Sequence, residues 1–167
     1  MKAISDSIAY LDQYVYKPCG LLLQNLRIEK QNEEYEGSTF TLNDVFIRHR
    51  TAKITPKKIG QFVAIWEKDE HNVNRPFLYE HSPEFLVVNT FTNEHRGQFV
   101  FPRDVLREKG ILSTPSQKGK MALRVYPVWD IPTSKQAVAT QKWQLLYFLD
   151  FTEGINDAAV KKLYSGC

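Results

Sequence analysis

The sequence predicts an α+β fold in a single domain, residues 1–167: a mixed β-sheet or open pseudobarrel of about six or seven strands, with a helix toward each end and a short helix near 102–109. Three observations support this prediction. Apolar residues recur at helical spacing near the N-terminus. Six short segments rich in β-branched and aromatic residues follow, bounded by Gly, Pro, Asn or Asp. The C-terminal part then runs without glycine or proline to about residue 152. A restriction-endonuclease-like α/β fold is the competing architecture.

The first element is an amphipathic helix. Its apolar positions are Ile4, Ile8, Leu11 and Val15, with Asp and Gln between them. This spacing predicts a helix from about Ser5 to Tyr16 that ends before Pro18. The segment "QNEEYEG", residues 31–37, is typical of a polar loop.

The middle of the chain predicts strands. The six candidates are residues 38–42, 45–54, 60–67, 84–91, 97–102 and 120–127. A short helix lies between the last two, with Pro102 at its first position, Asp104 near the positive end of its dipole and Gly110 as its stop. A long helix should begin after Thr133 or Ser134 and reach about Thr152, and the tail beyond it should add one more turn or fray.

Composition indicates a folded, soluble chain. With 167 residues and 43% apolar content it is long enough for one ordinary domain, and no apolar run approaches the ~20 residues that span a bilayer. Asp6 and Asp12 interrupt any apolar core of a signal peptide, so we expect a cytoplasmic protein without a membrane segment. Cys19 and Cys167 are far apart and predict neither a disulfide framework nor a zinc site.

The net charge of +3 is unevenly distributed. Residues 1–44 carry −3, residues 45–66 carry +5 and the remainder carries +1. No Asp or Glu occurs among the 22 residues between Asp44 and Glu67. A second acid-free stretch, 110–129, carries three more cations. Two such segments could form one positive face in space.

The first of these segments reads "RHRTAKITPKKIG" at 48–60. On a strand Arg48 and Arg50 would project to the same side, Lys53 would follow after a change of direction, and Lys57 and Lys58 would lie at the tip of a turn. Two guanidiniums and a lysine-bearing loop are suited to phosphate. A solvated edge strand protected by its charges is the alternative, but the absence of acids over 22 residues favours an anion-facing surface.

Catalytic motifs are missing. No Asp or Glu stands two residues before a Lys, as a PD-(D/E)xK nuclease requires, and the nearest match pairs Glu94 with Arg96. No Walker, dinucleotide or G-x-S-x-G motif occurs. His71, His81 and His95 lack metal-binding spacing and suit surface or loop positions. We therefore predict no catalytic residue, no metal and no cofactor.

Four ordered motifs resemble the MepB family: "RTAKITPKKIGQFVAIWEKD", "RGQFVFPRDVLREKGIL", "KMALRVYPVWD" and "TQKWQLLYFLDF". The likeness covers about residues 35–152. Members are small bacterial proteins, one of them encoded beside a multidrug efflux pump and its MarR-type repressor. This context suggests a neighbouring transcriptional repressor as one partner.

The unit from Gln98 to Val125 is also similar to part of the B-three type DNA-binding pseudobarrel, which occurs in plant transcription factors and in effector domains of restriction enzymes. That fold grips the major groove with two loop-and-strand arms. The resemblance implies candidate arms at 48–58 and 118–124.

The main hypothesis is a non-enzymatic nucleic-acid-binding protein, with double-stranded DNA as its partner. The candidate contacts to backbone phosphate are Arg48, Arg50, Lys53, Lys57, Lys58, Lys118, Lys120 and Arg124. One alternative is a divergent metal-dependent nuclease with carboxylates drawn from Glu34, Glu36, Asp44 or Glu67. Another is a protein-interaction or ligand-binding module linked to multidrug-resistance regulation.

Overall fold

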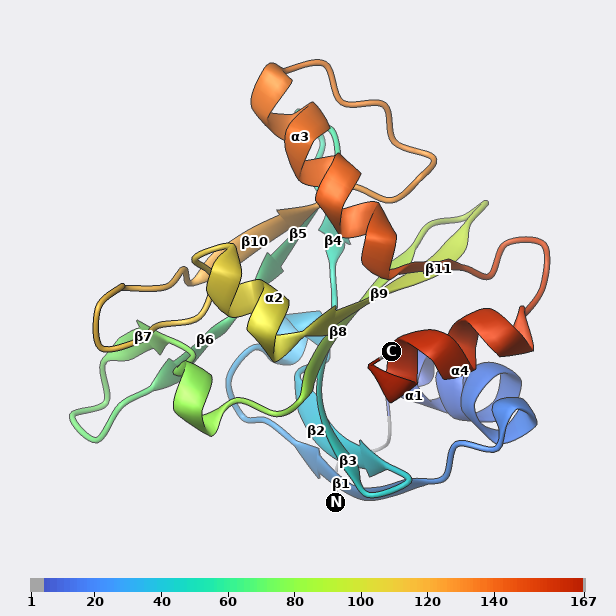
Figure 1. Ribbon diagram of the computed structural model, residues 1–167, viewed down its shortest axis with the longest axis horizontal. Coiled ribbons are helices and arrows are strands. Elements are labelled where there is room, and N and C mark those ends of the chain that lie inside the picture. Colours follow the sequence, from blue (N-terminus) through green and yellow to red (C-terminus); the bar gives the residue numbers. More distant parts are fainter. Residues whose placement is uncertain (1–4, 167) are drawn as a thin grey trace.

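Three β-sheets and four α-helices make up the part of the chain that the computed structural model describes, residues 5–166 (Figure 1). Six strands form the main sheet in the order β1-β2-β3-β8-β9-β11. They are β1 (Leu23–Ile28), β2 (Ser38–Leu42), β3 (Val45–Thr51), β8 (Phe85–Phe91), β9 (Arg96–Pro102) and β11 (Phe148–Asp150). Paired strands run antiparallel except β3 and β8, which run parallel. The predicted α+β fold with an open, mixed sheet is confirmed.

The chain leaves the main sheet between β3 and β8 to build most of a second one. The segment contributes β4 (Lys53–Ile54) and β5 (Gln61–Ala64), and β10 (Ala122–Val125) joins them in the order β10-β5-β4. A hairpin of β6 (Trp66–Lys68) and β7 (Asn74–Pro76) follows. Two predicted strands, 45–54 and 60–67, are therefore each split in two where the chain changes sheet.

The helices at the two ends of the chain cover one face of the main sheet, and the second sheet covers the other (Figure 1). On β8, Val87 packs beneath α1 (Asp6–Leu11) and α4 (Asp157–Ser165), whereas Val88 packs in the core shared with the second sheet and α2 (Arg103–Glu108). Alternate strand residues point to opposite faces, so a buried strand requires a continuous apolar run such as Phe85–Val88.

The N-terminal helix agrees with its prediction over the described residues. Ser5 caps α1, its hydroxyl accepting a hydrogen bond from the Ile8 amide at 3.2 Å, and the chain continues as a π-helical turn, Asp12–Tyr16. Ile4 lies outside the described residues. The short helix is also confirmed, with Pro102 as its N-cap residue and Gly110 beyond its end at φ +72°.

The C-terminal prediction is wrong in its second half. Helix α3 (Lys135–Gln144) is capped by Ser134 as expected, but it ends in a 3-10 turn, Leu145–Tyr147, and the chain becomes β11. Strand β11 pairs with β9, where Gly97 leaves room for the Phe148 ring: a Cβ at Gly97 would lie 2.5 Å from that ring. The tail forms the nine-residue helix α4 instead of a single turn.

Strand β1 is an element that the sequence did not predict. Asn25 adopts φ +58° at a register shift between Gln24 and Arg27, and this bulge breaks the alternation of apolar and polar residues that identifies a strand. The strand nonetheless pairs with β2. It also leads directly to Glu29, which proves important for the arginines of β3.

A hydrogen-bonded network of buried polar side chains crosses the core beneath α1 and α4. The Tyr164 hydroxyl donates to Gln98 Oε1, Gln98 Nε2 donates to Asn89 Oδ1 at 2.9 Å, and Asn89 Nδ2 donates to His49 Nε2 at 2.8 Å. Tyr16 and Tyr164 join their hydroxyls at 2.7 Å, and burial raises the pKa of Tyr16 to about 12. Buried polar groups need such partners. This network therefore connects α4 and the π-helical turn to three strands of the main sheet.

Candidate nucleic-acid interface

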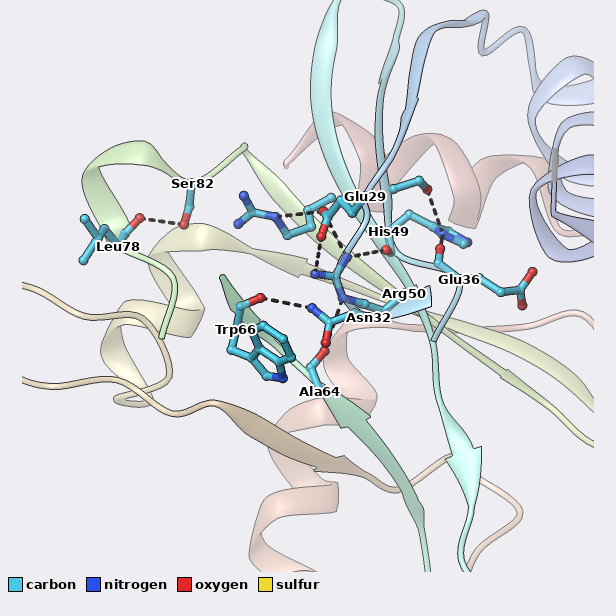
Figure 2. Close-up of polar contacts among 11 residues, drawn as sticks. Glu29, Asn32, Glu36, His49, Arg50, Ala64, Trp66, Leu78 and Ser82 are labelled. Atoms are coloured by element: carbon cyan, nitrogen blue, oxygen red, sulfur yellow. Dashed lines mark hydrogen bonds and ion pairs between the residues drawn. The ribbon is translucent and has the colours of Figure 1, made fainter. Parts of the chain in front are cut away.

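The two arginines of the basic strand point into the protein. Arg48 and Arg50 do share one side of β3, but Arg50 is fully buried and the Arg48 side chain is only 14% exposed. The expectation that both face phosphate in solvent is wrong. The physical reason is Glu29, whose carboxylate binds the Arg50 guanidinium and lies 3.8 Å from Arg48 Nε (Figure 2).

Arg50 has a complete set of internal partners. Its Nη1 and Nη2 donate to the two oxygens of Glu29 at 3.1 and 2.8 Å, and its Nε donates to the Ala64 carbonyl at 3.2 Å (Figure 2). Nη1 also donates to the His49 carbonyl at 2.9 Å. Because these bonds join β3, β5 and the residue that follows β1, Arg50 holds the second sheet against the main sheet.

Arg48 lies flat against an aromatic ring. Its guanidinium carbon is 3.6 Å from the centre of the Phe77 ring, and its Nε is 3.8 Å from Glu29. Burial lowers the pKa of Arg48 to about 10, so the side chain keeps its charge at neutral pH. This contact is typical of a structural cation–π pair and leaves little of the side chain for a ligand.

Lys53 is at the boundary of the exposed surface. It starts β4 after the chain turns at Ala52, which confirms the predicted change of direction. The side chain is 47% exposed, bonds Glu34 at 3.0 Å and lies 5.1 Å from the Tyr35 ring centre. Glu34 partly neutralises it, so Lys53 is a weaker candidate for phosphate than the lysines that follow.

Lys57 and Lys58 stand at the tip of the loop between β4 and β5, as predicted, and both are exposed. Neither forms an ion pair with any residue in 5–166. The loop closes at Gly60, which has φ +87° and would place a Cβ 2.7 Å from the Tyr126 ring. A left-handed backbone and a ring in contact both require glycine here.

The second acid-free segment lies beside the first. Strand β10 pairs with β5, with Arg124 opposite Phe62, and Phe62 is in turn opposite Lys53 on β4. Residues paired across strands share a face, so one row crosses the second sheet from Lys53 to Arg124. The two charge runs therefore meet in one sheet, where Arg124 of the second run shares a face with Lys53 of the first.

Arg124 connects this row to the lysine loop. Its Nη1 donates to the Thr55 hydroxyl at 3.0 Å and to the Ile59 carbonyl at 3.2 Å, on both sides of the loop tip. Lys118 and Lys120 are exposed on the segment that leads into β10. We call Lys57, Lys58, Lys118, Lys120 and Arg124 the basic surface.

A hollow of about 250 Å³ lies between β10 and α3. Ala122 and Arg124 of β10, with Lys120 just before the strand and Tyr126 just after it, line one wall, and the first half of α3 lines the other. Both polar and apolar atoms face it. The hollow is open and shallow, and it brings α3 next to the basic surface.

The sequence reading missed the lysines of α3. Lys135 and Lys142 are exposed, and no Asp or Glu occurs between Asp130 and Asp150. This third acid-free run, residues 131–149, is itself visible in the sequence. Its proximity to β10 depends on the fold.

The carboxylates considered for a nuclease do not converge. Glu34 bonds Lys53, Glu36 accepts from the Ser7 hydroxyl at 2.6 Å, and Glu67 bonds Arg75 at 3.0 Å. Asp44 lies exposed in the turn between β2 and β3. Over residues 5–166, no group of three or more His, Cys, Asp or Glu side chains could hold a metal ion.

The three histidines that lack metal-binding spacing lie at or near the surface. His71 and His81 are exposed, and His95 stacks on Trp129 with ring centres 4.6 Å apart. Cys19 is buried and Cys167 lies outside the described residues. None of the helices in the described part of the chain has the length and apolar character needed to cross a bilayer.

Comparison with known proteins places this α+β domain in a family. The MepB-like family model matches residues 29–150, and the chain belongs to that family. The chain is similar to the crystal structure of MepB, with 40% identity, a TM-score of 0.77 and coverage of 89% of this chain and 97% of that one. No curated protein matches.

A second solved structure is similar at a much lower level. It is a bacterial homing endonuclease with 13% identity and a TM-score of 0.44, covering 86% of this chain and 94% of that one. A likeness at that level supports no argument about activity.

Proposed function

We propose that this protein binds nucleic acid without cleaving it, with double-stranded DNA as its partner and the basic surface as its contact. The observation that supports this most directly is the pairing of β10 with β5, which joins two acid-free segments some sixty residues apart in sequence. Backbone phosphates attract such a surface regardless of base sequence.

The loop between β4 and β5 is suited to this role because it is held in place without its lysines. Arg124 fixes both sides of the loop, while Lys57 and Lys58 extend from its tip. A loop that is ordered before binding loses less conformational entropy when a phosphate arrives. Lys118 and Lys120 supply further charge on the segment that leads into β10.

Salt dependence is the physical signature of such binding. If all five cations of the basic surface neutralise phosphates, affinity should fall roughly 500-fold between 50 and 200 mM salt, because each contact releases a condensed counterion. Fluorescence anisotropy with a labelled duplex across a salt series measures this slope. A slope near zero, or no binding at 50 mM salt, contradicts the proposal.

Charge reversal at the loop tip should weaken DNA binding at least about tenfold at 100 mM salt and lower the salt slope by about two contacts. The variant is Lys57→Glu with Lys58→Glu. The matched control is Lys30→Glu with Lys162→Glu, which makes the same charge change at two exposed lysines outside the basic surface that likewise form no ion pair within residues 5–166. Equal losses in both variants would indicate a net-charge effect and contradict a local contact.

A divergent nuclease remains the alternative from the enzyme class. It predicts that Mg²⁺ or Mn²⁺ produces cleavage that a chelator abolishes. Binding that persists with intact DNA in the presence of either ion supports the binding function. Metal-dependent cleavage of the DNA would instead support the nuclease and contradict the proposed binding function.

A further inference from the structure

Helix α3 is anchored by its C-terminal half alone. Gln144 Oε1 accepts from the Tyr126 amide at 2.9 Å, and its Nε2 donates to the Arg124 carbonyl at 3.0 Å. These two bonds pair backbone groups at the free edge of β10 with the side chain of Gln144. Gln141 Nε2 donates to the carbonyls of Pro127 and Asp130 at 3.0 and 2.8 Å. Trp143 packs on Phe101 in the core, with ring centres 5.5 Å apart. These contacts fix the direction of the helix.

The N-terminal half of α3 projects from the body of the protein (Figure 1). From Lys135 to Thr140 no residue is buried, and Val138 is 49% exposed. Four of these six residues are exposed, and Ala137 and Thr140 are half-buried beside the hollow. A helix in this setting usually covers a core with one apolar stripe. This half-helix covers none, so its side chains are available to a partner.

The charge around the projecting half indicates the partner. Lys135 starts the helix and Lys142 follows two turns later, with no acid from residue 131 to 149. The wall facing α3 across the hollow carries Lys120 and Arg124. The cations around this half-helix attract a polyanion, and its exposed apolar residues can contact apolar groups on that partner. The major groove of DNA offers both, with phosphates along its edges and thymine methyl groups inside it.

We propose that the projecting half of α3, Lys135–Thr140, enters the major groove of the DNA, while the basic surface contacts the flanking phosphates. This inference rests on the proposed function. A helix is about 10–12 Å wide and the groove about 12 Å. Six helical residues span about 9 Å, close to a groove depth of about 8.5 Å.

Three exposed side chains on different sides of this half-helix match groove chemistry. Gln136 can pair with adenine through two hydrogen bonds. Val138 and Ala139 can contact the methyl group of thymine, as small apolar side chains do. Lys142, at the end of the helix that stays outside the groove, would contact phosphate and set the position of the helix.

A neutral substitution separates groove contact from general attraction. Gln136→Ala combined with Val138→Ala should weaken binding of an A·T-containing duplex about tenfold and leave the salt slope unchanged, because no charge is altered. The matched control is Leu146→Ala, at the far end of the same segment, where the side chain is 71% exposed. This control should keep wild-type affinity. Circular dichroism and thermal melting verify that all variants fold alike.

Competition identifies the groove. Methyl green, a major-groove ligand, should displace the protein, and netropsin, a minor-groove ligand, should not. The reverse pattern overturns the inference. So does an unchanged affinity in the Gln136/Val138 variant when the Lys57/Lys58 variant binds weakly, a result that leaves the proposed function standing. If the wild-type protein does not bind DNA, or binds anionic phospholipid vesicles instead of DNA, both this inference and the proposed function are overturned.

Discussion

Replacing Glu29 with glutamine should lower the free energy of unfolding by about 3–5 kcal/mol, because the change leaves two buried cations without their counter-charge. Arg50 is fully buried and bonds both Glu29 oxygens, and Arg48 lies 3.8 Å from one of them. Urea unfolding monitored by tryptophan fluorescence measures the loss, and no change in m-value is expected.

A matched control removes a carboxylate of the same type from an exposed pair. Glu34→Gln breaks the bond to Lys53, where the side chains are 66% and 47% exposed, and should cost less than about 1 kcal/mol. Glu29→Asp keeps the charge but shortens its reach, so its loss should fall between the two. A Glu29→Gln cost no greater than that of Glu34→Gln would contradict the structural role of this cluster.

This cluster also determines how binding should be tested. Substituting Arg48 or Arg50 would disturb the junction of the two sheets, so any loss of DNA binding in those variants would report on folding. The exposed lysines are free of this ambiguity. Lys57 and Lys58 have no structural partner among residues 5–166, so their substitution changes the surface charge and little else.

Helix caps, helix stops and turns are the features that the sequence predicted correctly. Gly110 ends α2, Ser134 caps α3, and the loop carrying Lys57 and Lys58 turns where the sequence reads Thr-Pro-Lys-Lys. Each of these features depends on a few neighbouring residues. Proximity of the two acid-free segments was also correctly expected, because long stretches without acids are uncommon on ordinary mixed-charge surfaces.

The failures concern distant partners. Nothing near Arg50 indicates that it is buried, because its carboxylate comes from Glu29, 21 residues earlier, after a strand whose bulge conceals it. The strand Phe148–Asp150 reads equally well as the continuation of a helix. It becomes a strand because β9 offers an edge with Gly97 at the site of the Phe148 ring. Pairing across the sheet outweighs local propensity in both cases.

His49 illustrates the same limit within the basic run itself. In the sequence it adds to a cluster of cations, but alternation on β3 turns it to the opposite face from Arg48 and Arg50, into the core beneath α1 and α4. There it is fully buried. Burial, which the sequence does not reveal, therefore leaves His49 uncharged and removes it from the cluster of cations.

Acidification from pH 7 to pH 5 should lower the free energy of unfolding by about 2 kcal/mol through His49 alone, given an unfolded pKa near 6.5. Burial lowers the pKa of His49 in the fold to about 4. The unfolded chain therefore binds the proton more readily. Stability from this residue is complete above pH 6.5 and is lost as the pH falls toward 4.

Hydrogen bonding explains why the neutral ring is required. Asn89 donates its amide to Nε2, so the ring hydrogen is on Nδ1, which donates to the Glu36 carbonyl at 3.0 Å. A second ring hydrogen would face the Asn89 amide, whose oxygen is already held by Gln98. Asn89 cannot rotate to accept it without breaking that bond. Protonation therefore leaves a buried charge opposite a donor.

The measurement is urea unfolding at pH 7, 6 and 5 for three proteins. His49→Gln should lose stability at pH 7 yet show little further loss on acidification. His81→Gln, the control, changes an exposed histidine and should keep the wild-type slope. Burial raises the pKa of Glu36, but hydrogen bonds led by Ser7 outweigh it, and the net decrease places its own contribution below pH 4.5. An unchanged slope in His49→Gln would show that the proton uptake occurs elsewhere.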